Sequence, residues 1–266
     1  MKMKQFECVI FDWAGTTVDY GCFAPVQAFM EAFGHFGIEV TMEETRRPMG
    51  MLKIDHIRAM LKMDRIAKLW EETHRRAWTD EDVHAIYEQF EPKLLSILDR
   101  CSSPKPFVLD AVAELRRMGL KIGSTTGYTD KMMEIVVPEA AKQGYCPDCW
   151  FSPDSTGGAG RPYPYMIFRN MEQLRLSSVK AIVKAGDTVS DIKEGVNAGA
   201  WSVGIIEGSS ELGFSEKEWE RLSASEKTAA AKRAEASFRN AGAHFVIQNM
   251  AELPGLVRML GAEAHI

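Results

Sequence analysis

The fold is decided by the stretch CVIFDWAGTT, residues 8–17. Its first four residues are apolar and favour a short strand that is buried on both faces. The strand ends at the carboxylate of Asp12, and the Gly-Thr-Thr that follows suits a tight turn with free backbone N–H groups. An aspartate at this end of a strand lies where open α/β sheets bind their ligands. The alternative is that Asp12 only caps the turn, so the rest of the chain must decide.

Strands and helices alternate from residue 108 onward. We expect strands at residues 120–126, 149–152, 181–187, 201–205 and 244–247, and helices at 108–118, 130–143, 165–174, 192–198, 215–240 and 250–260. This alternation is typical of a parallel sheet with helices on both faces. The sequence therefore predicts an α/β fold with a Rossmann-like, doubly wound parallel sheet.

Residues 21–99 show helical patterns and no strand signal. One helix is expected at 24–36, a second after the capping box at 41–44, a third beginning at Met49, and a fourth after Thr79. We interpret residues 21–99 as an all-helical cap domain that is inserted into the core. The core then comprises residues 1–20 and 100–266, and the segment 102–106 links the cap back to it.

The composition excludes several classes of function. The net charge of −5 gives no basic surface for nucleic acid, and no apolar run reaches the ~18 residues of a membrane span. The first strand begins so early that no signal peptide is expected. Five dispersed cysteines suggest reduced thiols in the cytoplasm. The Cys146–Cys149 pair lacks further soft ligands nearby, so we expect no zinc or redox site there.

Polar residues follow three of the expected strands. Asp12 ends the first, Thr126 the second and Asp187 a later one, and parallel strands bring such ends to one edge of the sheet. Two aspartates that meet there repel each other unless a cation joins them, and hard oxygen ligands select Mg²⁺. Arg161, which precedes a helix, adds a guanidinium suited to phosphoryl or phosphonyl oxygens.

These residues resemble the four motifs of the haloacid dehalogenase (HAD) superfamily. The motifs are an aspartate after the first strand, a Ser/Thr after a second, a Lys/Arg before a helix, and Gly-Asp-x-x-x-Asp. The helical insertion is similar to that superfamily's first type of cap. In most of its phosphatases a second aspartate, two residues after the first, protonates the leaving alkoxide. Here that position is Ala14, which has two explanations: the chain is catalytically inactive, or the leaving group needs no proton from this position.

A lysine in the cap supplies a reason for this departure. Met49, Lys53 and His56 are spaced i, i+4 and i+7, so we expect them on one helix face with the lysine in the middle. Apolar surroundings and a nearby cation lower the pKa of a lysine and make it a Schiff-base former. Taken alone, Lys53 would be an ordinary solvated helix lysine.

The combination resembles the phosphonatase branch of the superfamily. The segments that carry it are DWAGTTVDYG (12–21), MGMLKIDHIR (49–58), STTGYT (124–129), GRPYP (160–164) and GDTVSDIKEG (186–195). The resemblance implies hydrolysis of the carbon–phosphorus bond of phosphonoacetaldehyde, in the degradation of 2-aminoethylphosphonate, by a homodimer. It also implies these roles: Asp12 as nucleophile, Lys53 as Schiff-base lysine, Asp12, Asp187 and the Ala14 carbonyl as Mg²⁺ ligands, Thr126 and Arg161 at the phosphonyl group, Cys22, Met49, His56 and Tyr128 at the aldehyde, and Gly127 and Asp191 in support.

The chemistry gives an independent reason for pairing a lysine with Asp12. A carbanion leaves phosphorus poorly, but an iminium two bonds away accepts the electrons of the C–P bond. Three alternatives remain: a HAD phosphomonoesterase with an atypical first motif, a haloacid dehalogenase, and a non-catalytic phosphoryl-binding relic. A phosphomonoesterase leaves Ala14 unexplained, and a haloacid dehalogenase leaves Asp187 unexplained. A non-catalytic relic does not require Asp12 and Lys53 together.

Overall fold

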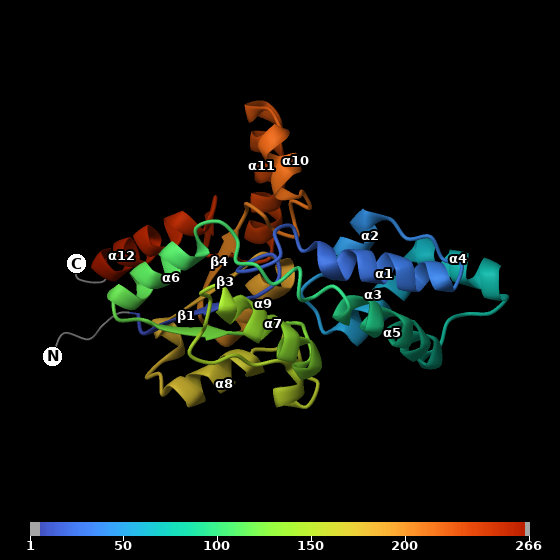
Figure 1. The fold of residues 1–266 in the computed structure, drawn as a ribbon, viewed down its shortest axis with the longest axis horizontal. Helices are drawn as coiled ribbons and strands as arrows, with labels where there is room; N and C mark the ends of the chain where they lie inside the picture. The colour runs from blue at the N-terminus through green and yellow to red at the C-terminus, as the bar shows by residue number, and fades with distance from the viewer. Residues whose placement is uncertain (1–5, 264–266) are drawn as a thin grey trace.

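A parallel sheet forms the centre of the larger part of the molecule (Figure 1). The computed structural model describes residues 6–263. Within them the sheet has five strands in the order β2-β1-β3-β4-β5, and every neighbouring pair is parallel. The strands are β1 (Cys8–Phe11), β2 (Lys121–Ser124), β3 (Ile182–Gly186), β4 (Trp201–Ile205) and β5 (Phe245–Ile247). Since β1 lies between β2 and β3, its apolar residues are buried on both faces, as the sequence predicts.

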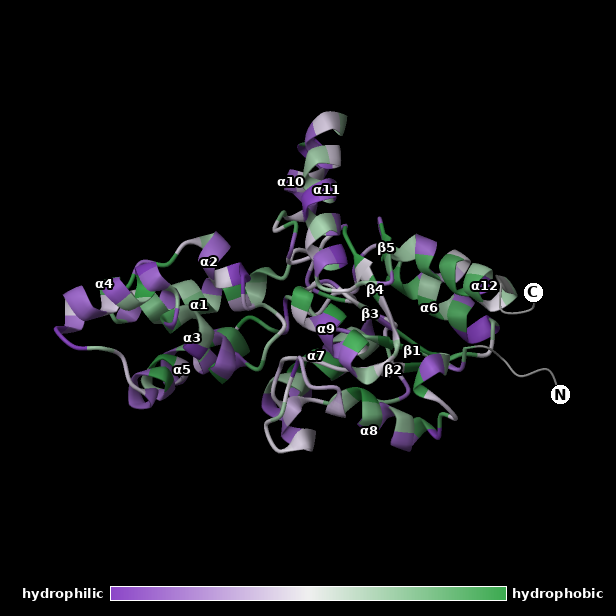
Figure 2. Ribbon diagram, turned by 180° about the vertical axis from the view of Figure 1, so that it is seen from behind, coloured by the Kyte–Doolittle hydropathy of each residue, from purple (hydrophilic) through white to green (hydrophobic). Residues whose placement is uncertain are grey.

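Helices cover both faces of the sheet. Val9 and Phe11 belong to the apolar cluster that includes helices α6 and α12, whereas Cys8 and Ile10 pack with helices α8 and α9 on the opposite face. Figures 1 and 2 show α6 and α12 on one side of the strands and α8 on the other. The helices of this part are α6 (Val108–Arg117), α7 (Asp130–Lys142), α8 (Tyr165–Leu174), α9 (Val189–Ala198), α10 (Glu216–Arg221), α11 (Ala224–Asn240) and α12 (Leu253–Glu263), with short 3₁₀ turns η1 (Pro153–Thr156), η2 (Val179–Ala181) and η3 (Met250–Glu252). The doubly wound α/β fold is thus confirmed.

Five helices lie between β1 and α6 in the chain and beside the sheet in space (Figure 1). They are α1 (Phe23–His35), α2 (Met42–Arg46), α3 (Lys53–Leu61), α4 (Asp64–His74) and α5 (Asp80–Leu95). The rings of Phe29 in α1 and Phe90 in α5 stack with centroids 4.1 Å apart. The expected capping box at Thr41 forms, with Glu44 as its partner. We refer to these helices as the cap; that residues 21–99 form a separate domain stays a prediction.

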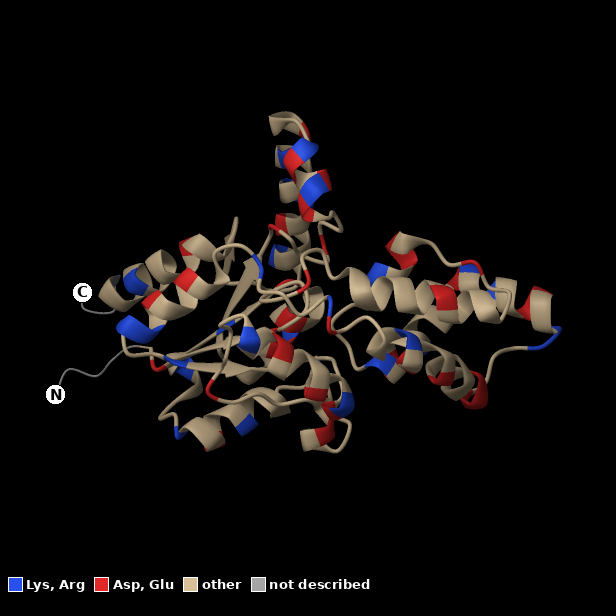
Figure 3. Cartoon of the chain, viewed as in Figure 1, with Lys and Arg blue, Asp and Glu red and all other residues tan. Residues whose placement is uncertain are grey.

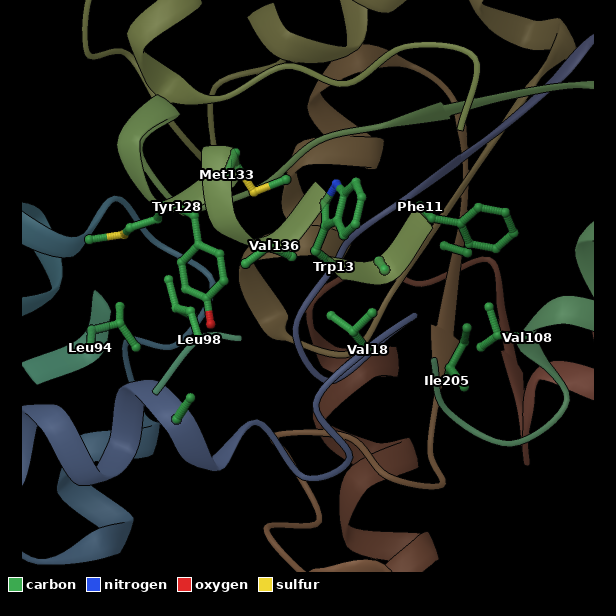
Figure 4. Packing of buried hydrophobic residues seen from close by; sticks show 14 of the residues in the cluster. Phe11, Trp13, Val18, Leu94, Leu98, Val108, Tyr128, Met133, Val136 and Ile205 are labelled. Carbon is green, nitrogen blue, oxygen red and sulfur yellow. The ribbon is translucent and has the colours of Figure 1, made fainter. Parts of the chain in front are cut away.

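The cap and the core share one apolar cluster. Tyr128, which follows β2, lies beside Leu94 of α5 and Leu98, three residues after that helix, and Trp13 and Val18, which follow β1, continue the same cluster (Figure 4). The C-terminal ends of β1, β2 and β3 therefore face the cap. The residues that follow these strands, among them Asp12, Thr126 and Asp187, lie at this end of the sheet.

Two expectations about secondary structure are wrong. Residues 149–152 form no strand: one bridge joins Phe151 to Thr125, and Ser152 then caps η1, which begins at Pro153. The third helix begins at Lys53 rather than Met49, because Gly50 adopts a φ of 85° and Leu52, the residue before the helix, has a ψ of 136°. Met49 therefore does not share a helix face with Lys53 and His56.

No helix within residues 6–263 is both long and apolar enough to cross a bilayer. Helices α10 and α11 project from the sheet and carry charges of both signs along their length (Figure 3). Both of these helices begin with the capping boxes expected at Ser215 and Ser223.

Candidate active site

Three aspartates meet at the edge of the sheet that faces the cap. Asp12 follows β1, Asp187 follows β3, and Asp191 lies in the first turn of α9. All three are buried, and one carboxylate oxygen from each lies within 4.8 Å of the others. Three carboxylates this close, away from water, repel one another and need positive charge nearby.

Asp187 is held by the loops around it. Its two carboxylate oxygens accept hydrogen bonds from the Thr16 hydroxyl at 2.9 Å and the Ser210 N–H at 2.8 Å. A Cβ at Gly15 would lie 2.1 Å from the Asp187 carboxylate, so only glycine fits there. Burial and the charges of Asp12 and Asp191 raise the pKa of Asp187 well above its usual value. A bound cation would stabilise the ionised form of this carboxylate.

Asp191 already has its positive partners. Its carboxylate lies 2.8 Å from the Lys184 ammonium and 3.1 Å from the Arg161 guanidinium, and it accepts a bond from the Thr188 hydroxyl at 2.6 Å. Burial alone would raise the pKa of Asp191, but the charges of Arg161 and Lys184 outweigh it, and the pKa is lowered. Asp12 also has the Arg161 guanidinium at 2.7 Å, which leaves Asp187, without an ion pair in the described residues, as the carboxylate that most needs a cation.

A further oxygen donor is the carbonyl of Ala14, two residues after Asp12 in the chain. The carbonyl of Ala14 accepts no hydrogen bond within residues 6–263, since the turn after β1 directs its bonds to the carbonyls of Trp13 and Val18. Two carboxylates and a free carbonyl are a hard oxygen donor set. The residues present therefore fit a divalent cation.

Arg161 reaches the same edge from the loop before α8. Its Nη1 lies 2.7 Å from an Asp12 carboxylate oxygen, its Nη2 donates to the Thr125 hydroxyl at 2.8 Å, and its Nε lies 3.0 Å from a Glu194 carboxylate oxygen. Burial would lower the pKa of Arg161, but Asp191, Asp12 and Glu194 raise it above its ordinary value. A fixed, charged guanidinium thus lies against the carboxylate of Asp12.

A small pocket joins these groups to the cap. Its cavity volume is about 10 Å³, which is room for a single water molecule. Most of the expected site residues line this pocket. The lining residues are Asp12, Ala14, Cys22, Met49, Gly50, Lys53, Thr126, Gly127, Tyr128, Arg161 and Thr188.

Lys53 is the cap residue with the most unusual surroundings. It is 3% exposed, and its ammonium has no hydrogen bond or ion pair in the described part of the chain. Its Nζ lies 4.9 Å from the centre of the Tyr128 ring and 6.0 Å from that of Phe29. Burial lowers the pKa of Lys53, with Arg161 acting in the same direction against Cys22 and Asp12. Such an amine is prepared to lose its proton and act as a nucleophile.

Cys22 and Met49 lie together on the cap side of the pocket. Both are buried and pack in one small cluster with Val26 of α1. Met49 comes to the pocket from the turn before α3, which is why it lines the pocket without belonging to that helix. Burial raises the pKa of Cys22 well above its usual value, so its thiol stays protonated.

His56 is buried one turn after Lys53 and does not line the pocket. Its Nε2 bonds to the Thr45 carbonyl at 2.8 Å, and its ring stacks on Phe29 with centroids 3.9 Å apart. Burial and the charge of Lys53 lower the pKa of His56 far below its usual value, so the imidazole is neutral. Its place is therefore behind Lys53 rather than at the pocket wall.

The loop after β2 forms the core side of the pocket. The Thr126 hydroxyl accepts a bond from the Tyr128 N–H at 3.0 Å. Gly127 lies against the cap: a Cβ there would be 2.7 Å from the Met51 carbonyl and 2.8 Å from the Gly50 carbonyl. Cap and core are thus in direct backbone contact at this point.

The sequence analysis missed three buried residues of the site. Glu194 and Thr125 hold the guanidinium of Arg161, and the Lys105 ammonium donates to the carbonyls of Gly15 and, at 2.9 Å, Glu207. Glu194 could have been found because it follows Asp191 by three residues on an amphipathic helix. Lys105 and Thr125 carried no signal of their own, since loop lysines and strand-end threonines are ordinary on a surface.

The site combines a carboxylate, a guanidinium against it, oxygen ligands for a cation and a buried amine from the cap. Residues 6–199 match the family described as haloacid dehalogenase-like hydrolase. The fold, the strand-end aspartates and this match place the chain in the HAD-like hydrolases.

Individual relatives narrow the class. The chain is 52% identical to a protein of Lysinibacillus sphaericus named phosphonoacetaldehyde hydrolase, over 97% of this chain and 96% of that protein. It is also 52% identical to a Clostridioides difficile protein named bifunctional phosphonoacetaldehyde hydrolase/aminoethylphosphonate transaminase, over 96% of this chain and 40% of that protein. A crystal structure of a phosphonoacetaldehyde hydrolase-like protein from Oleispira antarctica is 37% identical, with a TM-score of 0.93 over 97% of this chain and 94% of that one. The chain belongs to the phosphonoacetaldehyde hydrolase family.

Proposed function

We propose that this chain hydrolyses the carbon–phosphorus bond of phosphonoacetaldehyde and releases phosphate and acetaldehyde. The observation that carries the proposal is the buried amine of Lys53, which has no ion pair within residues 6–263 and lies in the same pocket as Asp12 and Arg161. The printed names of the relatives support the same substrate.

The phosphonyl group would bind at the core side of the pocket. Arg161 and Thr126 would hold its oxygens, and the aldehyde would point toward Lys53, Cys22 and Met49 in the cap. Magnesium, held by Asp12, Asp187 and the Ala14 carbonyl, would reduce the repulsion between the Asp12 carboxylate and the phosphonate oxygens.

The amine of Lys53 then adds to the aldehyde carbon, and loss of water gives an iminium. A carboxylate oxygen of Asp12 attacks phosphorus, and the electrons of the C–P bond move into the iminium, which leaves as an enamine. Water hydrolyses the aspartyl phosphate to phosphate. The enamine takes a proton on carbon, and a second water releases acetaldehyde and the free amine. The lowered pKa of Lys53 favours the first step, because only the neutral amine can add to the aldehyde.

Ala14 favours this function over the phosphomonoesterase alternative. It lines the same pocket as Asp12, and its methyl side chain can neither give nor take a proton. An ester oxygen would need a proton on departure, whereas the enamine carbon can be protonated afterwards. A non-catalytic relic would have no use for a buried amine in the same pocket as Asp12.

Further features follow from the family resemblance. Residues 21–99 would act as a cap domain that opens and closes on hinges near Gly21 and residues 102–106. The chain would form a homodimer and work in the cytoplasm, where the five cysteines, all free here, would remain reduced. Transamination of 2-aminoethylphosphonate would supply the aldehyde, in keeping with the two activities named for the C. difficile relative.

The experiment that tests the function is steady-state release of phosphate from phosphonoacetaldehyde and from p-nitrophenyl phosphate, side by side. We expect rapid turnover of the first, with one acetaldehyde formed per phosphate, and slow turnover of the second. Efficient hydrolysis of the ester without C–P cleavage would instead identify a phosphomonoesterase, and no turnover of either would favour the relic.

A further inference from the structure

Glu194 lies in the middle of α9 and has no exposed surface. Its carboxylate oxygen Oε2 accepts a bond from the Arg161 Nε at 3.0 Å and from the Thr125 hydroxyl at 2.9 Å, and it lies 3.5 Å from the Lys184 ammonium. The other oxygen, Oε1, has no hydrogen-bond partner within the described residues. Burial of a carboxylate costs desolvation free energy, which its contacts must offset. Because these contacts of Glu194 fall on Oε2, we expect the role of this carboxylate to lie in the groups that Oε2 holds.

The contacts of Glu194 and Thr125 form a closed arrangement around the guanidinium. The Thr125 hydroxyl donates to Glu194 and accepts from the Arg161 Nη2, while Glu194 accepts from the Nε. Two of the three guanidinium nitrogens, Nε and Nη2, are thus held by Glu194 and Thr125. This leaves the third, Nη1, directed at Asp12 at 2.7 Å.

Two carboxylates attract the Nη1 group of Arg161. Asp12 and Asp191 both lie within 3.1 Å of its Nη1. If the guanidinium followed these two carboxylates freely, it would be less well placed to hold the oxygens of an incoming anion. A negative charge behind the Nε resists that movement, because the planar fork can turn only by breaking a charge-assisted bond.

We propose that Glu194 is a positioning residue that acts on the substrate through Arg161 and touches no reacting atom. This proposal rests on the proposed function in one respect, namely that Arg161 binds the phosphonyl group. The predicted consequence is specific: loss of Glu194 weakens binding of the phosphoryl or phosphonyl end of a ligand and leaves the chemistry of Lys53 with aldehydes unchanged.

Glu194→Gln is the first test, because the amide keeps an oxygen for Arg161 and Thr125 and removes the charge. We expect the dissociation constant of inorganic phosphate, measured by calorimetry with magnesium present, to rise about tenfold or more. Thr125→Val, which keeps the shape of the side chain and removes the bridging hydroxyl, should give a smaller rise in the same measurement. It also keeps the test open if Glu194→Gln fails to fold.

The matched control is Glu172→Gln. Glu172 pairs with Arg169 at 2.6 Å on the surface of α8, so the same carboxylate is removed from an exposed Arg–Glu pair. Phosphate binding should not change. Trapping of acetaldehyde on Lys53 by borohydride should proceed at the wild-type rate in all three variants, since acetaldehyde has no phosphonyl group.

A double-mutant cycle separates positioning from a general structural effect. In an Arg161→Lys background, where the fork is absent, Glu194→Gln should cause little further loss of phosphate affinity. Wild-type phosphate affinity in Glu194→Gln, an equal loss in both backgrounds, or a parallel fall in acetaldehyde trapping would each overturn the proposal. Phosphate binding needs no C–P cleavage, so this result stands apart from success or failure of the proposed reaction.

Discussion

The ammonium of Lys53, in cap helix α3, lies 4.9 Å from the centre of the Tyr128 ring, which belongs to the core loop after β2. One residue of the cap and one of the core therefore build the same wall of the pocket. No carboxylate in the described part of the chain pairs with this lysine. Its charge therefore depends on an aromatic face and on apolar neighbours, which stabilise it far less than water does.

This burial predicts a trade-off between stability and activity at Lys53. Because burial lowers its pKa in the folded chain, the unfolded chain binds a proton that the folded chain lacks at pH values between the lowered pKa and the ordinary ~10.4. Lys53 should therefore reduce stability increasingly as the pH falls through that range. Lys53→Met should raise the Tm at neutral pH by about 2 °C or more and abolish turnover. Thermal denaturation at several pH values checks this.

Lys68→Met on α4 is the control for that substitution, since the Lys68 side chain is 79% exposed. Its Tm and turnover should stay near wild type. A lower Tm in Lys53→Met than in the native protein would show that the buried ammonium is stabilised after all.

Asp12 should be indispensable for the cleavage step alone. Asp12→Asn should reduce phosphate release about a thousandfold or more, because the amide is a poor nucleophile. The imine should still form, since Lys53 lies on the cap. Near-native phosphate release by Asp12→Asn would rule out attack of Asp12 on phosphorus.

Magnesium should be required for turnover. Chelation should stop phosphate release and added magnesium should restore it, and Asp187→Ala should raise the magnesium concentration needed, because one anionic ligand is gone. Phosphate release measured over a magnesium titration checks the effects of chelation and of Asp187→Ala.

Closure of the cap should be sensitive to Gly127. A cavity of about 10 Å³ is too small for the substrate, so we expect the cap to open for its entry. In the present arrangement the Gly50 and Met51 carbonyls lie within 3 Å of the position of a Cβ at residue 127, so a side chain there would oppose closure. Gly127→Ala should lower kcat/KM for the phosphonate about tenfold or more and leave phosphate binding intact. Gly34→Ala in α1, where a Cβ meets nothing within 4 Å, is the control. Equal kinetics in both variants would mean that this contact is not required.

Ala14 should set the choice of leaving group. Ala14→Asp adds a fourth acid next to the cluster of Asp12, Asp187 and Asp191, crowds the imine and could pair with its charge. We expect a drop of about tenfold or more in phosphonate turnover and at most a small gain in ester hydrolysis. Phosphate release from both substrates, with native and variant proteins in parallel, measures this. Undiminished phosphonate turnover in the variant would remove the argument from Ala14.

Much of the fold follows from local signals in the sequence. Apolar runs that end in polar residues located β1, β2 and β3, and the Ser/Thr-x-x-Glu spacings at Thr41, Ser215 and Ser223 gave true helix starts. These signals succeed because strand burial and helix capping depend on residues that are close in the chain.

The errors have tertiary causes. A helix through Met49 fits the local spacing, but Gly50 takes a positive φ where its backbone meets Thr188 of the core, and the helix starts later. Residues 149–152 look like a strand, but they lie past β2 and only a single bridge forms there. Lys105 escaped notice for a similar reason, since its role depends on a partner 90 residues away. Glu194 is different: its partner Arg161 is 33 residues away, but its spacing from Asp191 was a local signal.

The most direct test of the central claim is the mass of the protein after borohydride is added together with phosphonoacetaldehyde. We predict complete loss of activity and one added group per chain, located by peptide mapping on Lys53, with no such product in Lys53→Arg, which keeps the charge but cannot form the imine. Full activity of Lys53→Arg, or trapping at another lysine while Lys53 stays unmodified, would contradict the mechanism.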